Sequence, residues 1–104
     1  MTYYTYLIKS KLNNITYIGI TNNLEKRLYK HNNKLGAKAT RRHSDWEYIK
    51  IVQLTNKNIA ASLEYYWKHY LTQNNTFART KPGIKNKIDR LNEIIKNYEH
   101  VIIL

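Results

Sequence analysis

The 104-residue sequence has no cysteine and few acidic residues, and it contains no long apolar run. Without cysteine the chain cannot form disulfide bonds, cysteine-based zinc sites or thiol nucleophiles. No apolar stretch approaches the roughly 18 residues that a membrane-spanning helix requires, and the N-terminal residues lack the basic and then apolar pattern of a secretory signal. These absences lead us to expect an intracellular protein that does not span a membrane.

Internal repeats, linkers and low-complexity segments are also missing. A chain of 104 residues has the length of one domain, which can bury a core but is too short to form two domains. Hydrophobic residues make up 42% of the sequence, a share that fits a folded domain and not a disordered tail. We therefore expect residues 1–104 to form a single domain.

The shortage of acidic residues leaves a large positive charge. Eighteen lysines and arginines (Lys+Arg 18) face only 7 aspartates and glutamates, and the formal net charge is +11. Such an excess on a small domain favours a polyanionic partner, most often nucleic acid, over an anionic membrane surface. The charge is also clustered, because one acid-free segment carries Lys26, Arg27, Lys30, Lys34, Lys38, Arg41 and Arg42.

A β-hairpin is predicted at the N-terminus. Residues 3–9 and 15–20 are rich in Tyr, Ile, Thr and Leu, and Asn13-Asn14 between them suits a tight turn. A two-residue loop there pairs Ser10 with Tyr17 and Ile8 with Gly19. The predicted register puts on one face Tyr4, Tyr6, Ile8, Tyr17 and Gly19, whereas a loop longer by one residue would separate Tyr6 from Tyr17.

Helical patterns and a third strand follow the hairpin. A helix is predicted to about residue 33 or 34, with Asn22 and Glu25 resembling a capping box, and it places Arg27 and His31 on one face. Residues 34–43 suit a short helix or an ordered loop, and residues 46–54 suit a strand. Further helices are predicted over residues 57–72 and 84–98, and the apolar tail 101–104 is expected to dock on this domain or on a second copy.

Glu64 is the least ordinary residue of the 57–72 helix. It lies within a narrow apolar arc formed by Ala60, Leu63, Trp67 and Leu71. A carboxylate among apolar neighbours is costly unless it is paired, protonated or bound to a metal. The other candidates also have non-functional interpretations. Tyrosines on strands, such as Tyr6 and Tyr17, usually serve packing, and Arg27 and His31 on an exposed helix face would usually be solvated.

The order of these features changes that interpretation. A hairpin with Tyr6 and Tyr17-Ile18-Gly19, a helix with Arg27 and His31, and a later helix with Glu64 together resemble the GIY-YIG endonuclease superfamily. The resemblance covers about residues 4–71, and it is greatest to the small stand-alone members and to the nuclease module of structure-specific endonucleases.

Parts of the family pattern are altered in this chain. Tyr17-Ile18-Gly19 matches the second half of the family name, whereas Tyr4-Thr5-Tyr6 stands in place of Gly-Ile-Tyr and keeps only the tyrosine. An asparagine commonly follows the metal glutamate in the family. Its counterpart is not identified here, and the candidates are Asn74, Asn75 and Asn86.

The resemblance implies an α/β (α+β) fold, with a small three-stranded antiparallel sheet flanked by helices. It also implies metal-dependent hydrolysis of DNA phosphodiester bonds, with a preference for structure and not for sequence. Glu64 would hold Mg²⁺ or Mn²⁺, and Arg27 would clamp the scissile phosphate. Tyr6 is then the leading candidate for general base, with its pKa lowered by the metal and Arg27, while Tyr17 orients the water or the phosphate and His31 supports either.

The remaining residues would bind the substrate. Gly19 is expected to leave room over the sheet for a phosphate. Duplex or branched DNA would be bound without sequence preference by Lys26, Lys30, Lys34, Lys38, Arg41 and Arg42.

Two other functions stay open. In a non-catalytic nucleic-acid-binding protein, the tyrosines would stack on bases and Glu64 would pair with a lysine or arginine. In a partner-dependent nuclease subunit, the tail from Val101 to Leu104 would dock on another protein or on a second copy of the chain.

Overall fold

The computed structural model describes residues 2–69 and 84–104. The predictions for Leu71, Asn74 and Asn75 therefore lie outside the described residues. In chain order the elements are β1 (Tyr3–Ser10), β2 (Thr16–Thr21), α1 (Leu24–Asn32), the 3-10 turn η1 (Lys38–Thr40), β3 (Trp46–Leu54), α2 (Lys57–Lys68), α3 (Ile84–Ile94), the 3-10 turn η2 (Ile95–Asn97) and β4 (Ile102–Ile103).

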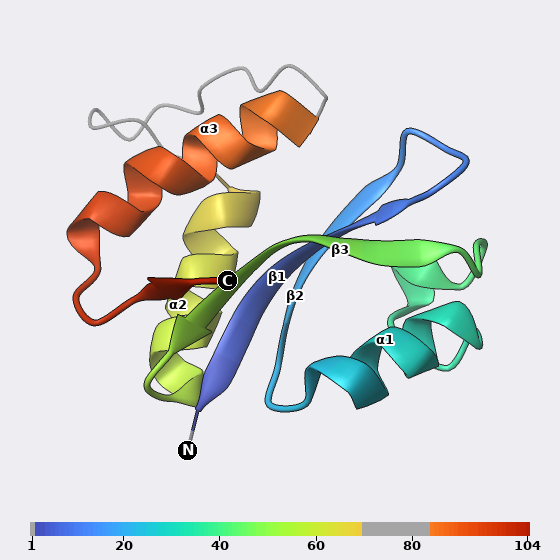
Figure 1. The fold of residues 1–104 in the computed structure, drawn as a ribbon, viewed down its shortest axis with the longest axis horizontal. Coiled ribbons are helices and arrows are strands. Elements are labelled where there is room, and N and C mark those ends of the chain that lie inside the picture. Colours follow the sequence, from blue (N-terminus) through green and yellow to red (C-terminus); the bar gives the residue numbers. More distant parts are fainter. Residues whose placement is uncertain (1, 70–83) are drawn as a thin grey trace.

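The strands form one antiparallel sheet in the order β2-β1-β3-β4. Figure 1 shows α1 on one side of this sheet and α2 and α3 on the other. The α/β prediction with an antiparallel sheet flanked by helices is confirmed, but the sheet has four strands and not three. The additional strand comes from the apolar tail, where Ile103 pairs with Val52 and Ile102 with Gln53 of β3.

The hairpin between β1 and β2 has a different register from the predicted one. Tyr6 pairs with Gly19 and Ile8 pairs with Tyr17, so the predicted pairing is wrong by two residues. The last ladder bond runs from the Ser10 amide to the Ile15 carbonyl at 3.0 Å, and residues 11–14 form the loop. Because side chains alternate with a period of two, this slip leaves Tyr6, Tyr17 and Gly19 on one face as predicted.

The longer loop is stabilised by Asp45, just before β3. The Asp45 carboxylate accepts hydrogen bonds from the Ser10 hydroxyl at 2.8 Å and from the Leu12 amide at 3.0 Å. These hydrogen bonds hold the Asp45 pKa below its usual value. The length of the hairpin loop thus depends on Asp45, which is 33 residues away from Leu12 in sequence. Turn preferences of residues 11–14 alone do not include this contact.

The two sides of the sheet bury different side chains. Toward α2 and α3 the core consists of Leu7, Ile18, Val52, Leu54, Ala60, Leu63, Trp67, Leu91 and Ile94. Toward α1 the buried hydrophobic residues are Tyr6, Ile8 and Trp46, with Tyr17, Leu28, Tyr48 and Ile51 packed against them. Alternation along β1 therefore directs the Tyr6 side chain into the layer beneath α1.

Asparagine side chains cap both helices next to the sheet. Asn23, and not Asn22, begins α1, because Asn23 has the extended backbone of an N-cap and its side chain accepts from the Lys26 amide at 3.0 Å. Asn56 caps α2 in the same way, accepting from the Ile59 amide at 2.9 Å. Within residues 2–69 and 84–104, no helix has both the length and the apolar character needed to cross a membrane.

Candidate active site

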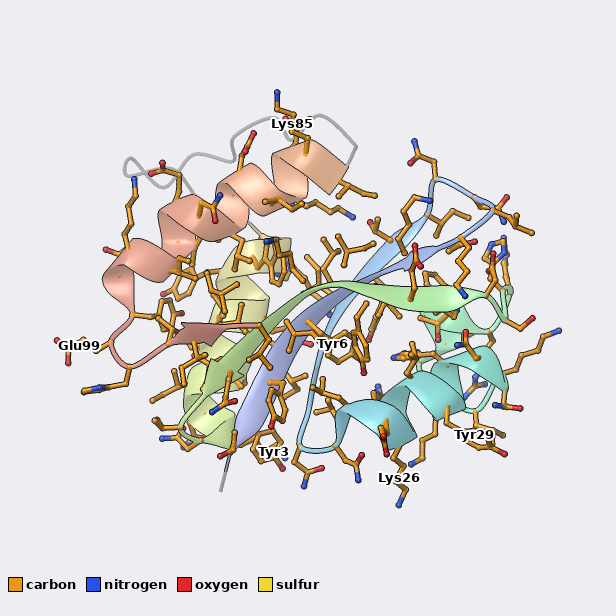
Figure 2. The ribbon with its side chains drawn as sticks, viewed as in Figure 1. Tyr3, Tyr6, Lys26, Tyr29, Lys85 and Glu99 are labelled. Atoms are coloured by element: carbon orange, nitrogen blue, oxygen red, sulfur yellow. The ribbon has the colours of Figure 1, made fainter. Side chains whose placement is uncertain are left out.

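Gly19 makes room for Tyr6 in the layer beneath α1. A Cβ atom on Gly19 would lie 2.5 Å from the Tyr6 Oη and 3.0 Å from Cε2 of Tyr17. Figure 2 shows Tyr6 pointing from β1 toward the side of the sheet that α1 covers. The Tyr6 phenol therefore occupies the space that was expected to receive a phosphate at Gly19. The absence of a side chain at Gly19 leaves room for the Tyr6 ring.

The Tyr6 hydroxyl is hydrogen-bonded to two side chains of α1. His31 Nε2 lies 2.8 Å from Tyr6 Oη, and Arg27 Nε donates to the same oxygen at 3.1 Å. Tyr6 and His31 are both fully buried. The four-residue spacing of Arg27 and His31 on α1 thus directs both side chains to one phenol.

Burial sets the protonation of this cluster. It raises the pKa of Tyr6 to about 12, although the hydrogen bond and charge of Arg27 act in the opposite direction. The lowered Tyr6 pKa expected from the sequence is therefore not present in the protein alone. Burial, aided by the Arg27 charge, lowers the pKa of His31 to about 4. At neutral pH the protein thus holds a protonated phenol against a neutral imidazole.

His31 is held from its other nitrogen by Thr40. The distance from His31 Nδ1 to Thr40 Oγ1 is 2.8 Å, and the Thr40 hydroxyl donates to the Ala37 carbonyl at 2.8 Å. Thr40 is fully buried, and it was missed as a candidate from the sequence. The only sequence feature that could have indicated Thr40 is its position at the end of the stretch from Gly36 to Thr40, inside the basic segment.

Tyr48 is a second residue of this layer that was missed. Its ring packs edge-on against Tyr6 with the centroids 5.4 Å apart, and its hydroxyl donates to the Leu24 carbonyl at 2.7 Å. Burial raises the pKa of Tyr48. Tyr48 thereby links β3 to the first turn of α1 beside the Tyr6 phenol.

Glu64 approaches the same cluster from α2. Its side chain is 25% exposed and lies 3.5 Å from the Lys68 ammonium, so it is paired and only partly buried. Its charge contributes to the raised pKa of Tyr6, which places it within electrostatic range of the phenol. Pairing was one of the three states expected for this carboxylate, but Lys68 was not identified as the partner.

Tyr17 connects the two layers at the β2 edge of the sheet. Its ring lies 5.5 Å from the His31 ring, measured between centroids, and the Lys68 ammonium lies 5.1 Å from its centroid. His31 belongs to α1 and Lys68 to α2, on opposite sides of the sheet. Because β2 is an outer strand, side chains from both helices can meet at its open edge. The structure thus brings Arg27, His31 and Tyr17 together around Tyr6, while Glu64 is linked to Tyr17 through Lys68.

A divalent cation would find one carboxylate in this cluster. In the part of the chain that the structure describes, no three His, Asp or Glu side chains lie together. Mg²⁺ needs no such cage, because it commonly binds through one or two carboxylates together with waters and substrate phosphate oxygens. Glu64 fits that donor requirement.

The basic residues fall into two groups. Lys26, Arg27 and Lys30 line a groove of about 420 Å³, together with Lys57 and residues of the β2–α1 connection. Lys38 and Arg42 line a second hollow of about 610 Å³ with Ile15, Ala39 and His43. Lys34 and Arg41 are exposed, and Arg41 Nε also donates to the Gly36 carbonyl at 3.3 Å. Arg27 is the residue that joins the first groove to the Tyr6 cluster.

The sequence matches a known catalytic domain over this whole region. The family model described as the GIY-YIG catalytic domain matches residues 2–78. That range includes the predicted catalytic residues Tyr6, Tyr17, Arg27, His31 and Glu64.

Several curated proteins are similar over the same part of the chain. UPF0213 protein CPE1444 of Clostridium perfringens (strain 13 / Type A) is 45% identical over 71 residues, covering 68% of this chain and 74% of that protein. UPF0213 protein YsiG of Lactococcus lactis subsp. lactis (strain IL1403) is 38% identical over 71 residues, covering 68% and 67%. Uncharacterized protein L300 of Acanthamoeba polyphaga mimivirus is 40% identical over 74 residues, covering 67% of this chain and 45% of that protein.

Proposed function

The chain belongs to the GIY-YIG family, and on this premise we propose that it is a metal-dependent endonuclease whose residues 1–104 act as one nuclease domain. Its substrate would be duplex or branched DNA, recognised by structure and not by sequence. The observation that supports this most directly is the meeting of Arg27, His31 and Tyr6 through hydrogen bonds of 3.1 and 2.8 Å. A guanidinium, a phenol and a neutral imidazole in contact are suited to binding a phosphate and moving a proton beside it.

Arg27 would bind the scissile phosphate. Its Nε donates to Tyr6, which fixes the plane of the guanidinium, and we assign its terminal NH₂ groups to the phosphate oxygens. The same positive charge favours transient negative charge on the Tyr6 oxygen. Arg27 thereby couples phosphate binding to activation of the nucleophile.

Tyr6 and His31 would carry the proton. Because Tyr6 is protonated at neutral pH, it can accept a proton from the attacking water only as its own proton leaves for His31 Nε2. The water oxygen forms a bond to phosphorus while the bond to the leaving oxygen breaks, and that oxygen takes a proton from bulk water. His31 then returns its proton to solvent, which balances the hydrolysis.

Glu64 would hold the divalent cation, Mg²⁺ or Mn²⁺, which when bound supplies Lewis-acid stabilisation of the charge on the phosphate and the leaving oxygen. Tyr17 would orient the water or the phosphate from the open edge of the sheet. Lys68, which pairs with Glu64 and approaches Tyr17, would exchange its contact with the carboxylate for one with the DNA backbone.

The test is cleavage of a panel of duplex, flap, branched and single-stranded DNA with Mg²⁺ or Mn²⁺. Glu64→Gln and Arg27→Ala should each abolish cleavage and leave DNA binding largely intact, because the first removes the negative charge of the metal-binding carboxylate and the second removes the phosphate clamp. Glu93→Gln is the matched control, since Glu93 is also a helical glutamate paired with a lysine, Lys96, but its side chain is 60% exposed and it lies on α3. Cleavage that survives in purified Glu64→Gln protein would contradict the metal assignment.

A non-catalytic nucleic-acid-binding function is the second candidate. The observation that favours it is the Glu64–Lys68 contact at 3.5 Å, since a paired glutamate needs no metal. This candidate predicts binding of DNA without cleavage of any member of the panel. The same Glu64→Gln variant would then bind DNA as the unaltered protein does.

A partner or a second copy at the C-terminal tail remains a proposal. The tail forms β4 on its own domain, yet Ile102, Ile103 and Leu104 are 52%, 44% and 60% exposed. Sedimentation velocity of the whole chain, compared with an Ile102→Lys and Ile103→Lys double variant, tests whether copies associate through these side chains. A single monomeric species in both would rule out the homodimer.

A further inference from the structure

Thr40 has one hydroxyl hydrogen and two short contacts. Its Oγ1 lies 2.8 Å from the Ala37 carbonyl oxygen and 2.8 Å from His31 Nδ1. A carbonyl oxygen can only accept, so the Thr40 hydrogen must point to Ala37. If it pointed to His31 instead, two oxygen lone pairs would face each other at 2.8 Å. The Thr40 oxygen therefore accepts a hydrogen bond, and His31 Nδ1 must carry the hydrogen.

This arrangement determines the other ring nitrogen. A neutral imidazole carries one hydrogen, so with Nδ1 protonated the Nε2 atom presents a lone pair. Tyr6 Oη lies 2.8 Å from that Nε2, so the phenol donates to the imidazole. The Tyr6 oxygen then has a lone pair for the Arg27 Nε–H at 3.1 Å. The bonds run in one direction, from Arg27 through Tyr6 and His31 to Thr40 and the Ala37 carbonyl.

The turn around Thr40 is built close to the imidazole. The Thr40 amide also donates to the Ala37 carbonyl, at 2.9 Å, so the backbone and side chain of Thr40 share one acceptor. A Cβ atom on Gly36 would lie 2.7 Å from His31 Nδ1, so only glycine allows the turn to approach this closely. His31 and Thr40 are both fully buried, which keeps water from replacing either partner.

We propose that Thr40 is a positioning residue that holds His31 in the Nδ1–H tautomer, so that His31 Nε2 accepts the Tyr6 proton during DNA cleavage. This role rests on the proposed function. In the transfer, the Tyr6 O–H bond breaks as a His31 Nε2–H bond forms, and the attacking water restores the Tyr6 O–H. In the other tautomer, Nε2–H would donate to Tyr6 and no acceptor would be present for the Tyr6 proton. Thr40 thus acts through His31 and touches no reacting atom.

The direct test is imidazole NMR of the full chain labelled with ¹⁵N at histidine. The unaltered protein should show His31 protonated at Nδ1 at neutral pH. Thr40→Val keeps the shape and removes the acceptor, so His31 should shift toward the Nε2–H form, whereas Thr40→Ser keeps the hydroxyl and should retain Nδ1–H. An Nε2–H tautomer in the unaltered protein, or an Nδ1–H tautomer unchanged in Thr40→Val, would overturn the proposal.

Single-turnover cleavage gives the second readout. Thr40→Val should slow the chemical step by roughly 10²-fold, the lower range for losing acid–base assistance, with little change in DNA affinity. Thr40→Ser should restore most of the rate, because its hydroxyl can make the same two contacts. Equal losses in the valine and serine variants would show that Thr40 acts through shape alone and would overturn the proposal.

The two readouts separate this proposal from the function on which it rests. If the unaltered protein cleaves no member of the DNA panel, the proposed nuclease function fails, but the imidazole spectra still decide whether Thr40 sets the tautomer. Thermal unfolding of each variant checks that it is folded. If Thr40→Val does not fold, Thr40→Cys is the substitute, because a thiol accepts hydrogen bonds far more weakly than a hydroxyl and should give the same tautomer shift.

Discussion

The side of the sheet that α2 and α3 cover is mainly apolar, with the buried Thr5 hydroxyl bonded to the Ala60 carbonyl, whereas the side that α1 covers combines the apolar Ile8 and Trp46 with the hydrogen-bonded Tyr6, His31 and Thr40. Leu7 and Tyr6 are neighbours on β1, and both are completely buried. Leu7 is held by packing, which has no direction, while Tyr6 is held by hydrogen bonds to His31 and Arg27. Adjacent residues of one strand therefore belong to the apolar core on one face and to the hydrogen-bonded candidate site on the other.

The largest effect on stability is expected from the apolar layer. Leu63→Ala should lower the free energy of unfolding by about 2–5 kcal/mol, because Leu63 is fully buried and a cavity would remain. Cleavage per folded molecule should change little, since Leu63 belongs to the core on the other side of the sheet from Tyr6. Denaturant unfolding, with activity measured at a temperature where the variant is folded, checks both.

Tyr6→Phe is the counterpart in the polar layer. It should cost about 1–3 kcal/mol, because Arg27 Nε and His31 Nε2 lose a buried partner, and it should abolish cleavage. Cleavage retained in Tyr6→Phe, or cleavage lost in folded Leu63→Ala, would contradict this division of roles between the two faces of the sheet.

Acid should destabilise the polar layer through His31. Its pKa is about 4 in the folded protein, below the unfolded value of 6.5, so the unfolded state binds a proton first as the pH falls. The contribution of neutral His31 to the free energy of unfolding is therefore fully present above pH 6.5. It is lost as the pH falls toward 4, by up to about 3 kcal/mol. Between pH 6.5 and 4, the free energy of unfolding should fall more steeply for the unaltered protein than for His31→Gln. His100→Gln is the control and should behave as the unaltered protein does. Parallel curves for all three proteins would contradict the shift.

Gly19→Ala is expected to lower the free energy of unfolding by about 1–3 kcal/mol, an effect similar to that of Tyr6→Phe. The added Cβ would lie 2.5 Å from Tyr6 Oη, so the phenol must move away from His31 and Arg27. Cleavage should fall much more than stability does. A Gly19→Ala variant that cleaves DNA at the normal rate would show that the position of the Tyr6 hydroxyl is unimportant.

Stability should change least when exposed cations are removed. Replacing Lys38, Arg41 and Arg42 together with alanine should change unfolding by no more than about 0.5 kcal/mol for each residue, but weaken DNA binding and flatten its salt dependence. The matched triple is Lys26, Lys30 and Lys57, which line the groove beside Arg27. The triple variant whose DNA affinity loses more of its salt dependence marks where the DNA backbone lies. If the Lys38, Arg41 and Arg42 triple keeps the salt dependence of the unaltered protein, the duplex lies elsewhere on the surface.

Most elements could be predicted from the sequence because they depend on local patterns. The β3 strand is found at the predicted residues 46–54, and α1 and α2 begin within one or two residues of the expected positions. Tyr6, Tyr17 and Gly19 share a face as predicted, although the register differs, because a slip of two residues preserves alternation. Arg27 and His31 meet one phenol because their helical spacing aligns them.

Other features depended on residues far apart in sequence. Asp45 stabilises a longer hairpin loop than Asn13-Asn14 suggests, and the tail pairs with β3 as a strand. Thr40 and Lys68 were missed as members of the site, because neither belongs to a pattern until the chain folds around His31 and Glu64. The roles of Glu64 and the DNA-binding cations stay predictions.

By itself, the sequence determined the family, the order of the helices and of the first three strands, and which side chains of the hairpin share a face. These follow from residue types and periodic spacing, which act over a few residues. Only the tertiary structure decided the hairpin register, the direction of the Tyr6 and His31 pKa shifts and the hydrogen-bond partner of His31 Nδ1. These depend on burial and on contacts between distant residues, because desolvation and hydrogen-bond direction are properties of the packed layer and not of any one segment.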